Sequence, residues 1–238
     1  YNYFLRGSDQ EYEDWGSSIH SWRSNPLLSE KDIDEARKSI TRALFAQEYE
    51  CEWTTTESQI YEALDEAKHI NDYVGERFAE VLAGLDVGYR DENVFVVIGF
   101  DGENYFLIDE YVSKESTTSE LAAAIQEKID EWNIDSIYID SAAQQVKADF
   151  AYDYDIYCEN AIKSVNDGIN FLQVLIESNR LFFDTLGASH TFSAMSSYKW
   201  NPNTETPKPV HDWASHPCDA VRYAIYTHSK MSNISIYA

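Results

Sequence analysis

The chain has 238 residues, of which 44% are hydrophobic and 14% aromatic, and this composition excludes disorder as its main state. Eighteen basic against 42 acidic side chains give a formal net charge of -24. No apolar run approaches the ~20 residues that a membrane-spanning helix needs. The length suits one domain of roughly 150 to 200 residues with an additional segment. Because the chain opens at Tyr1 without an initiating methionine or a signal peptide, we expect a piece of a longer protein.

The acidic charge is unevenly distributed. Residues 1–150 carry 12 basic and 33 acidic side chains, whereas residues 151–238 carry 6 and 9. The whole-chain charge argues against nucleic-acid binding, because contacts with phosphate use clustered Lys and Arg. Cys51, Cys158 and Cys218 are odd in number and lack C-x-x-C spacing, so neither a disulfide framework nor a zinc ribbon is indicated. A reducing cytoplasm is therefore expected.

The first part of the chain predicts helices and no strand. Ser29 with Asp32 has the pattern of a helix-capping box. The positions that follow place four apolar side chains on one helical face: Ile33, Ala36, Ile40 and Leu44. A second helix is expected over 58–72, ended by Gly75. We expect residues 1–75 to form a linker or lid segment and residues 76–238 to form the main domain.

Short apolar runs predict a sheet from residue 81 onward. The runs 81–87, 94–100 and 105–112, the last two joined by an Asp-Gly turn, predict three antiparallel strands. Further strands are expected over 137–139, 156–158 and 181–183, alternating with helices over 117–132, 142–150, 165–178 and 188–198. A final helix begins at Ser215, with Pro217 in its first turn. The fold class is mixed α/β.

Three carboxylates occupy positions that suggest chemistry. Asp86 lies in an apolar strand between Gly84 and Gly88, where a buried charge is costly unless it is paired or binds a cation. Asp140 ends the strand after the first long helix, at the sheet edge where α/β proteins usually hold ligands. Asp219 lies one turn into the final helix. The glycines predict close approach of another backbone or a ligand to the strand.

Each acid also has an ordinary structural explanation. Asp86 could be an ordinary turn or edge residue, and Asp140 could be a helix cap. Asp219 could be an acid that the helix dipole favours near the start of the helix. Small side chains at Ala220 and Ala224 let the final helix pack closely on the sheet. Taken together, the three acids are suited to hold two Mg²⁺ or Mn²⁺ ions, because such ions prefer carboxylate oxygens and promote phosphodiester hydrolysis.

The order of strand acid, antiparallel strands, helix, strand acid and helix acid resembles the ribonuclease H-like fold. The surrounding residues are similar to the nuclease domain of the large terminase subunit of tailed bacteriophages. The stretches that carry this similarity are Gly84-Leu85-Asp86-Val87-Gly88, Tyr138-Ile139-Asp140-Ser141-Ala142, Asn160-Ala161-Ile162-Lys163 with Gly168-Ile169, and Ser215-His216-Pro217-Cys218-Asp219-Ala220-Val221-Arg222-Tyr223. Two further stretches, Asn25-Pro26-Leu27 and Phe45-Ala46-Gln47-Glu48-Tyr49, resemble the segment that joins motor and nuclease.

This resemblance implies metal-dependent cleavage of double-stranded DNA concatemers during viral genome packaging. It implies that Asp86 bridges two Mg²⁺ or Mn²⁺ ions and that Asp140 and Asp219 complete one site each. No G-x-x-x-x-G-K-[ST] motif occurs in the chain, so the family's ATPase motor is expected outside it. In the full-length protein the portal protein and the small terminase subunit are the expected partners, and the host cytoplasm is the expected location.

The resemblance also revises the expectation drawn from charge, because bound cations reverse the local sign of an acidic site. DNA contacts or supporting roles are expected in the nearly neutral last third of the chain, at Lys163, Lys199, Lys208, His216 and Arg222. Each of these residues is also readable as an ordinary surface or packing residue. The proline-containing loop 201–210 is readable as a gate over the site or as a plain surface connection.

Three other functions remain open at this point. The Gly-Leu-Asp-Val-Gly stretch also occurs in actin-like sugar and acetate kinases, but those folds need a second half with its own phosphate loop. A resolvase or transposase of the ribonuclease H-like fold would keep the three acids. A non-catalytic portal-docking module would have lost metal binding.

Overall fold

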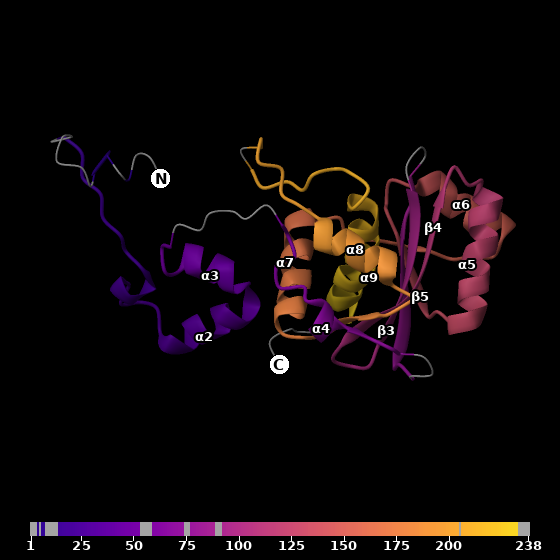
Figure 1. Ribbon diagram of the computed structural model, residues 1–238, viewed down its shortest axis with the longest axis horizontal. Coiled ribbons are helices and arrows are strands. Elements are labelled where there is room, and N and C mark those ends of the chain that lie inside the picture. The colour runs from indigo at the N-terminus through magenta and orange to yellow at the C-terminus, as the bar shows by residue number, and fades with distance from the viewer. Residues whose placement is uncertain are drawn as a thin grey trace. The chain divides into compact units, whose positions relative to one another are not determined.

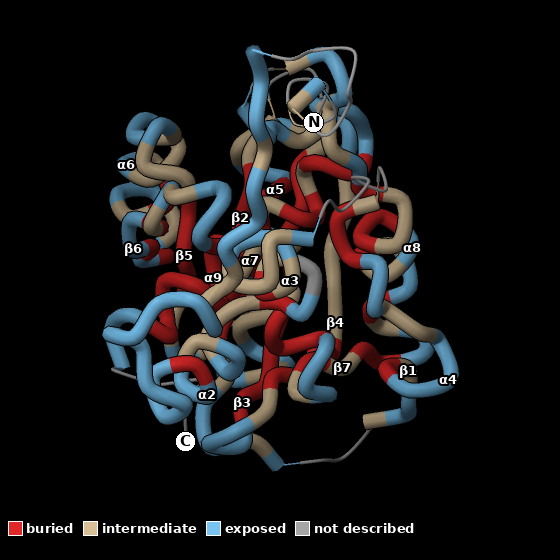
Figure 2. Tube along the Cα trace, turned by 90° about the vertical axis from the view of Figure 1, so that its left-hand side faces the viewer, coloured by how far each residue is buried: buried red, intermediate tan, exposed pale blue. Residues whose placement is uncertain are grey.

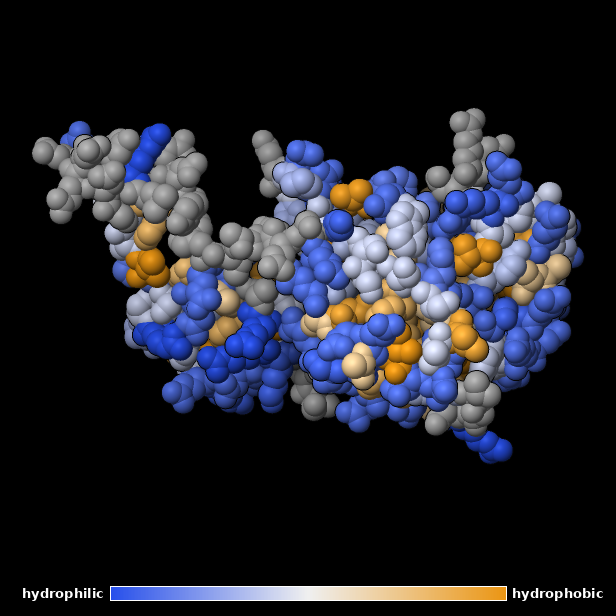
Figure 3. Space-filling model, viewed as in Figure 1, coloured by the Kyte–Doolittle hydropathy of each residue, from blue (hydrophilic) through white to orange (hydrophobic). Residues whose placement is uncertain are grey.

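The computed structural model describes residues 4, 6–7, 14–52, 59–73, 77–88, 92–204 and 206–232. The chain divides into two compact units, one of residues 1–57 with 236–238 and the other of residues 58–235. The three cysteines are free. Within the described ranges, no helix is both long and apolar enough to cross a membrane. Hydrophilic side chains cover most of the face seen in Figure 3.

The first unit contains a short 3-10 helix, Trp22–Ser24, and the helices α2 (Glu30–Ser39) and α3 (Arg42–Glu48). The predicted capping box of Ser29 and Asp32 is present. The single helical face expected through Ile40 and Leu44 is interrupted, because Ile40 is extended and the Thr41 side chain caps α3 by accepting a hydrogen bond from the Leu44 amide. Because Thr41 caps the start of α3, the chain forms two helices here instead of one continuous helix.

The second unit is built on a mixed sheet with the strand order β1-β7-β4-β3-β2-β5-β6. The strands β2 (Glu80–Asp86), β3 (Glu92–Phe100) and β4 (Tyr105–Lys114) are antiparallel neighbours, as predicted. The other strands join in parallel: β5 (Ser136–Ile139) beside β2, β6 (Glu159–Asn160) beside β5, β7 (Leu181–Asp184) beside β4, and β1 (Ile70–Asn71) beside β7. Most of β2 and β3 is buried (Figure 2).

Helices cover both faces of this sheet (Figure 1). The helices α5 (Thr118–Trp132) and α6 (Gln144–Asp153) lie on one face. The helices α7 (Val165–Glu177), α8 (Ser189–Ser197) and α9 (Ser215–Met231) lie on the other. The capping box of Thr117 and Glu120 begins α5 as predicted. Because α9 contacts the three strands β2, β3 and β5, it determines what lies over the centre of the sheet.

Two elements of the second unit also differ from the prediction. In place of a helix over 58–72, the described residues form an isolated bridge from Gln59 to Lys199, the four-residue helix α4 (Glu66–His69) and then β1. Ile60 and Tyr61 are buried, and residues 59–73 fall within the second unit. Gly75, expected to end the helix, lies outside the described residues. The strand expected over 156–158 instead pairs at Glu159–Asn160, where β5 supplies partners.

Gly84 allows α9 to lie directly on β2. A Cβ atom at Gly84 would lie 2.0 Å from the carbonyl oxygen of Ala220 and 3.1 Å from the Cβ of Ala224. Only glycine therefore fits at this strand position, as the flanking glycines and small helix residues predicted. The close approach brings the second turn of α9, which carries Asp219, over the end of β2 that carries Asp86.

A buried histidine near the end of α9 makes stability depend on pH. His228 is 2% exposed, and its ring nitrogens lie 3.0 Å from the Tyr105 hydroxyl and 3.2 Å from the Glu80 carboxylate. Burial lowers the pKa of His228 below its ordinary value, although Glu80 acts in the opposite direction. Because the unfolded chain binds the proton more readily, the free energy of unfolding falls as pH drops below about 6.5 toward the folded-state pKa.

We expect His228→Gln to be less stable than the unsubstituted chain at pH 7.5, by about 1–3 kcal/mol, because buried contacts are lost. We expect this difference to narrow at pH 5.5, because glutamine does not titrate. Urea unfolding at both pH values measures the difference. The exposed His20 gives the matched control, and His20→Gln should leave the pH dependence unchanged. A difference that stays constant with pH would contradict the prediction.

Candidate active site

The fold places the three predicted acids at one end of the sheet. Asp86 is the last residue of β2, and Asp140 follows the last residue of β5. Since β2 and β5 are parallel with Leu85 opposite Ile139, the two acids leave adjacent strands at the same edge. Asp219 comes to this edge on α9, through the close packing of Ala220 on Gly84.

The charges of all three carboxylates act on Tyr223, which lies one turn after Asp219 on α9. The Tyr223 hydroxyl lies 3.4 Å from Oδ2 of Asp140. Burial raises the pKa of Tyr223, and the negative charges of Asp219, Asp86 and Asp140 raise it further. Burial also raises the pKa of Asp86, and the neighbouring Asp219 and Asp140 add to this shift. The site is therefore a partly buried cluster of like charges.

Each acid has its own basic partner. Oδ2 of Asp86 lies 2.7 Å from Nδ1 of His216. Oδ1 of Asp140 lies 2.7 Å from Nζ of Lys163, and Oδ1 of Asp219 accepts a 2.8 Å hydrogen bond from Nη2 of Arg222. These three contacts offset the repulsion among the carboxylates.

The partners differ in how they affect protonation. Burial by itself raises the pKa of Asp140, but the Lys163 ammonium and the Ala142 amide outweigh it and hold that pKa below its ordinary value. For Asp86, by contrast, burial raises the pKa and the hydrogen bond from His216 does not overcome it. Two acids at one site thus have pKa values displaced in opposite directions.

The arrangement leaves oxygen ligands available. Oδ1 of Asp86 and Oδ2 of Asp219 make no hydrogen bond to any residue of the described ranges. Those same ranges hold no group of three or more His, Cys, Asp or Glu side chains already spaced as a metal cage. The residues present fit divalent cations by ligand type, because all three supply hard carboxylate oxygens, and they need side-chain adjustment to close around an ion.

The expected supporting residues lie in different environments. Lys163 and His216 contact the acids as described. Arg222 is 2% exposed, so it supports Asp219 from inside the protein. Lys199 and Lys208 are exposed on the loop before α9 and form no ion pair or hydrogen bond with the acids. That loop is a hairpin, held by a bridge between Trp200 and Pro209.

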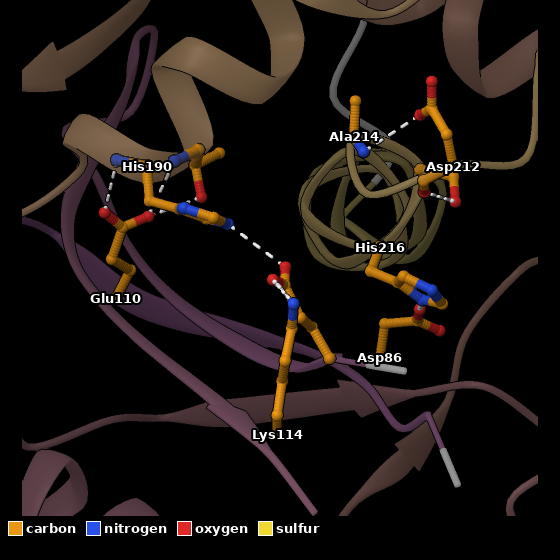
Figure 4. A network of polar contacts seen from close by, with 10 residues as sticks. Asp86, Glu110, Lys114, His190, Asp212, Ala214 and His216 are labelled. Atoms are coloured by element: carbon orange, nitrogen blue, oxygen red, sulfur yellow. Dashed lines mark hydrogen bonds and ion pairs between the residues drawn. The ribbon is translucent and has the colours of Figure 1, made fainter. Parts of the chain in front are cut away.

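A second polar network near Asp86 was not predicted from the sequence. The amides of His190 and Thr191, at the start of α8, donate to the Glu110 carboxylate at 2.7 and 2.8 Å. His190 Nε2 lies 3.4 Å from Glu92, which also pairs with Lys114 at 3.1 Å. Figure 4 shows this network and the pair of Asp86 and His216 in one view. One feature of the sequence could have indicated Glu110 as a candidate: it is an acid within a strand, β4, just as Asp86 is an acid within β2.

Comparison with known proteins identifies the family that has this fold. Residues 83–227 match the family described as Terminase RNaseH-like domain. The large subunit of the terminase of Escherichia phage T5 is 36% identical over 242 residues, which cover 96% of this chain and 55% of that protein.

Solved structures share the architecture. The large terminase of a thermophilic bacteriophage has a TM-score of 0.75 at 20% identity, over 93% of this chain and 56% of that one. The large terminase nuclease domain of bacteriophage SPP1, solved with bound Mn, has a TM-score of 0.55 at 21% identity, over 70% of this chain and 97% of that one.

These findings assign the second unit to the ribonuclease H-like domains found in terminases. The chain belongs to the family of terminase RNaseH-like domains, and it is similar to the large subunit of the T5 terminase. It spans just over half the length of the T5 protein and of the thermophilic phage protein.

Proposed function

We propose that this chain is the part of a large terminase that cuts double-stranded DNA concatemers during viral genome packaging, by metal-dependent phosphodiester hydrolysis. The observation that supports the proposal most directly is that Asp86 and Asp140 end adjacent parallel strands while α9, packed on β2, carries Asp219 at the same edge of the sheet. The SPP1 domain of the same fold was solved with bound Mn, which supports a divalent cation as the cofactor here.

In this proposal Asp86 would contribute to both cation sites, and Asp140 and Asp219 would complete one each. Two Mg²⁺ or Mn²⁺ ions, when bound, would activate a water for attack on the phosphodiester and neutralise the leaving oxygen. The chain's own residues hold these ligands in place: β2 and β5 supply two acids from rigid strand ends, and α9 supplies the third. His216, hydrogen-bonded to Asp86, orients that carboxylate.

The partners of the whole protein are also part of the proposal. They are an ATPase motor in the same protein, the portal protein and the small terminase subunit, in the host cytoplasm. The chain covers just over half of its T5 relative, which leaves room for a motor in the rest of such a protein. The 36% identity to a terminase over nearly the whole chain weighs against a resolvase or a transposase.

The test is conversion of supercoiled plasmid to nicked and linear DNA in Mn²⁺, Mg²⁺ or EDTA, comparing this chain with Asp140→Asn. We expect cleavage that needs metal and is lost in the variant. If neither chain cleaves, Mn²⁺ titration decides: binding would point to missing motor or DNA-binding parts. An absence of Mn²⁺ binding would instead favour the portal-docking module and overturn the nuclease proposal.

Lys163 is the residue best placed to contact DNA phosphate. Its side chain is 48% exposed while its ammonium lies against Asp140. We expect Lys163→Met to weaken DNA binding and to reduce the slope of log affinity against log salt by about 1, as loss of one phosphate contact should. Fluorescence anisotropy with duplex DNA at several salt concentrations measures this.

Lys128 provides the matched control for Lys163. Its ammonium also pairs with an aspartate, Asp109, but it lies on α5, on the opposite face of the sheet. Lys128→Met should leave the salt slope unchanged. An equal change in both variants would attribute the effect to net charge and contradict a specific phosphate contact by Lys163.

A further inference from the structure

We infer that Arg222 is a positioning residue for Asp219: from inside the protein it holds one carboxylate oxygen and so directs the other toward the cation. This inference rests on the proposed nuclease function and names a determinant of cation affinity at that site. Nη2 of Arg222 donates to Oδ1 of Asp219 at 2.8 Å, one helical turn away, while Oδ2 has no hydrogen bond within the described residues.

The Arg222 side chain is enclosed. It is 3% exposed, whereas the Asp219 side chain is 29% exposed. A buried guanidinium cannot be a DNA-contacting group, since phosphate binding needs an exposed cation. Asp219 is the only ion-pair partner of Arg222 among the described residues, so its carboxylate offsets the buried guanidinium charge. Nη1 of Arg222 is buried and forms no hydrogen bond with those residues. Arg222 is therefore held inside the protein, whereas the Asp219 carboxylate remains accessible from solvent.

Neighbouring groups on α7 and α9 restrict the conformation of the Arg222 side chain. Its guanidinium carbon lies 4.8 Å from the centre of the Tyr223 ring. On α7, a Cβ atom at Gly168 would lie 2.7 Å from both Cγ and Cδ of Arg222. Glycine at this position therefore makes room for the Arg222 stem. Two helices and an aromatic ring thus determine where the guanidinium points.

This geometry explains how the carboxylate of Asp219 is oriented within the acid cluster. Asp86 and Asp140 extend from strand ends, and His216 and Lys163 contact their carboxylates, whereas Asp219 lies on a helix surface where several rotamers are available. One charge-assisted hydrogen bond to a buried, immobile donor selects a rotamer for Asp219. It also offsets negative charge that would otherwise repel Asp86.

The experiment measures Mn²⁺ binding by the electron paramagnetic resonance signal of free Mn²⁺, using the full 238-residue chain. Loss of an outer-shell partner typically weakens a metal site about 10- to 100-fold, and we expect that loss in Arg222→Met. Arg222→Lys keeps the charge and should restore part of the affinity. Gly168→Ala displaces Arg222 from the α7 side and should weaken Mn²⁺ binding without any change in α9.

Arg180→Met is the matched control. Arg180 donates to the Glu103 carbonyl at the opposite end of the sheet, and its loss should leave Mn²⁺ affinity unchanged. Circular dichroism establishes folding. Should Arg222→Met fail to fold, Arg222→Lys and Gly168→Ala decide the question, because each keeps a positive charge at the buried position.

A double-mutant cycle separates positioning from general damage. If Arg222 acts through Asp219, Arg222→Lys should cause no further loss of Mn²⁺ affinity in an Asp219→Asn background. Unchanged affinity in folded Arg222 and Gly168 variants, with weakened affinity in Asp219→Asn, would overturn this inference alone. Unchanged affinity in Asp219→Asn would overturn the ligand assignment in the proposed function and this inference with it.

Discussion

Asp86→Asn is expected to abolish cleavage and to stabilise the fold at the same time. Burial raises the pKa of Asp86, and the charges of Asp219 and Asp140 raise it further, so the ionised carboxylate opposes folding at neutral pH. Removing this charge keeps an oxygen that can accept the His216 hydrogen bond. We expect a gain of about 1 kcal/mol, or about 2–4 °C in melting temperature, and loss of cleavage by about three orders of magnitude.

The pH dependence of this gain follows from the direction of the shift. Because the folded-state pKa of Asp86 lies above its value in the unfolded chain, the destabilisation is complete above the folded-state pKa. It disappears as pH falls toward the ordinary aspartate range near 3.9. The stabilising effect of Asp86→Asn should therefore be largest at neutral pH and shrink on acidification, as measured by thermal unfolding across pH.

Cation binding should reverse the order of stability. Mn²⁺ should raise the melting temperature of the unsubstituted chain, because a ligand that binds only the folded state stabilises it. It should have little effect on Asp86→Asn. The matched control is Asp101→Asn in the β3–β4 turn, where burial raises the pKa of Asp101 but hydrogen bonds from Asn104 and Glu103 outweigh it and lower that pKa. That control should destabilise without loss of cleavage, and a lower melting temperature for Asp86→Asn would contradict our account.

Gly84→Ala is expected to move α9 and to disable the site without changing any acid. The added Cβ would lie 2.0 Å from the Ala220 carbonyl oxygen, and a backbone atom cannot rotate away. Overpacking costs about 1–3 kcal/mol, and we expect the upper end of that range because helix and strand must separate. The shift moves Asp219 away from Asp86, so Mn²⁺ affinity should fall in molecules that remain folded.

Two other glycines separate loss of stability from displacement of Asp219. A Cβ atom at Gly187 would also lie 2.0 Å from a backbone oxygen, that of Ile108, but this contact joins the turn before α8 to β4 rather than α9 to β2. Gly187→Ala should therefore destabilise comparably and retain Mn²⁺ affinity. Gly16 has no atom near its Cβ position, and Gly16→Ala should change neither property. Equal loss of Mn²⁺ affinity in the Gly84 and Gly187 variants would contradict the positional explanation.

The sequence predicted elements best where the local pattern and the tertiary environment favour the same structure. The runs of β3 and β4, the capping box of Thr117 and the start of α9 at Ser215 all appear as expected. The prediction was wrong over 58–72, because Ile60 and Tyr61 pack into the second unit instead of along one helical face. Strand β6 shifted from 156–158, because pairing with β5 rather than local apolarity determines where it begins.

By itself, the sequence determined which acids to consider and on which elements they lie, because an acid in an apolar strand or at a strand end is unusual locally. It also predicted close helix packing, because Gly84, Ala220 and Ala224 lack bulky side chains. It did not distinguish exposed from buried basic residues among the candidates. Arg222 and Lys163 look alike as charges in a sequence, yet one is enclosed by α7 and α9 and the other is half exposed.

Only the tertiary structure decided which basic side chain pairs with which acid and how burial shifts each pKa. Hydrogen bonds and desolvation depend on distances between residues far apart in the chain, such as Asp86 with His216 or Asp140 with Lys163. Local patterns carry no information about such distances. The sequence therefore determines which residue types form the candidate site. Their pairing and their pKa shifts depend on the packing of α9 on β2 and β5.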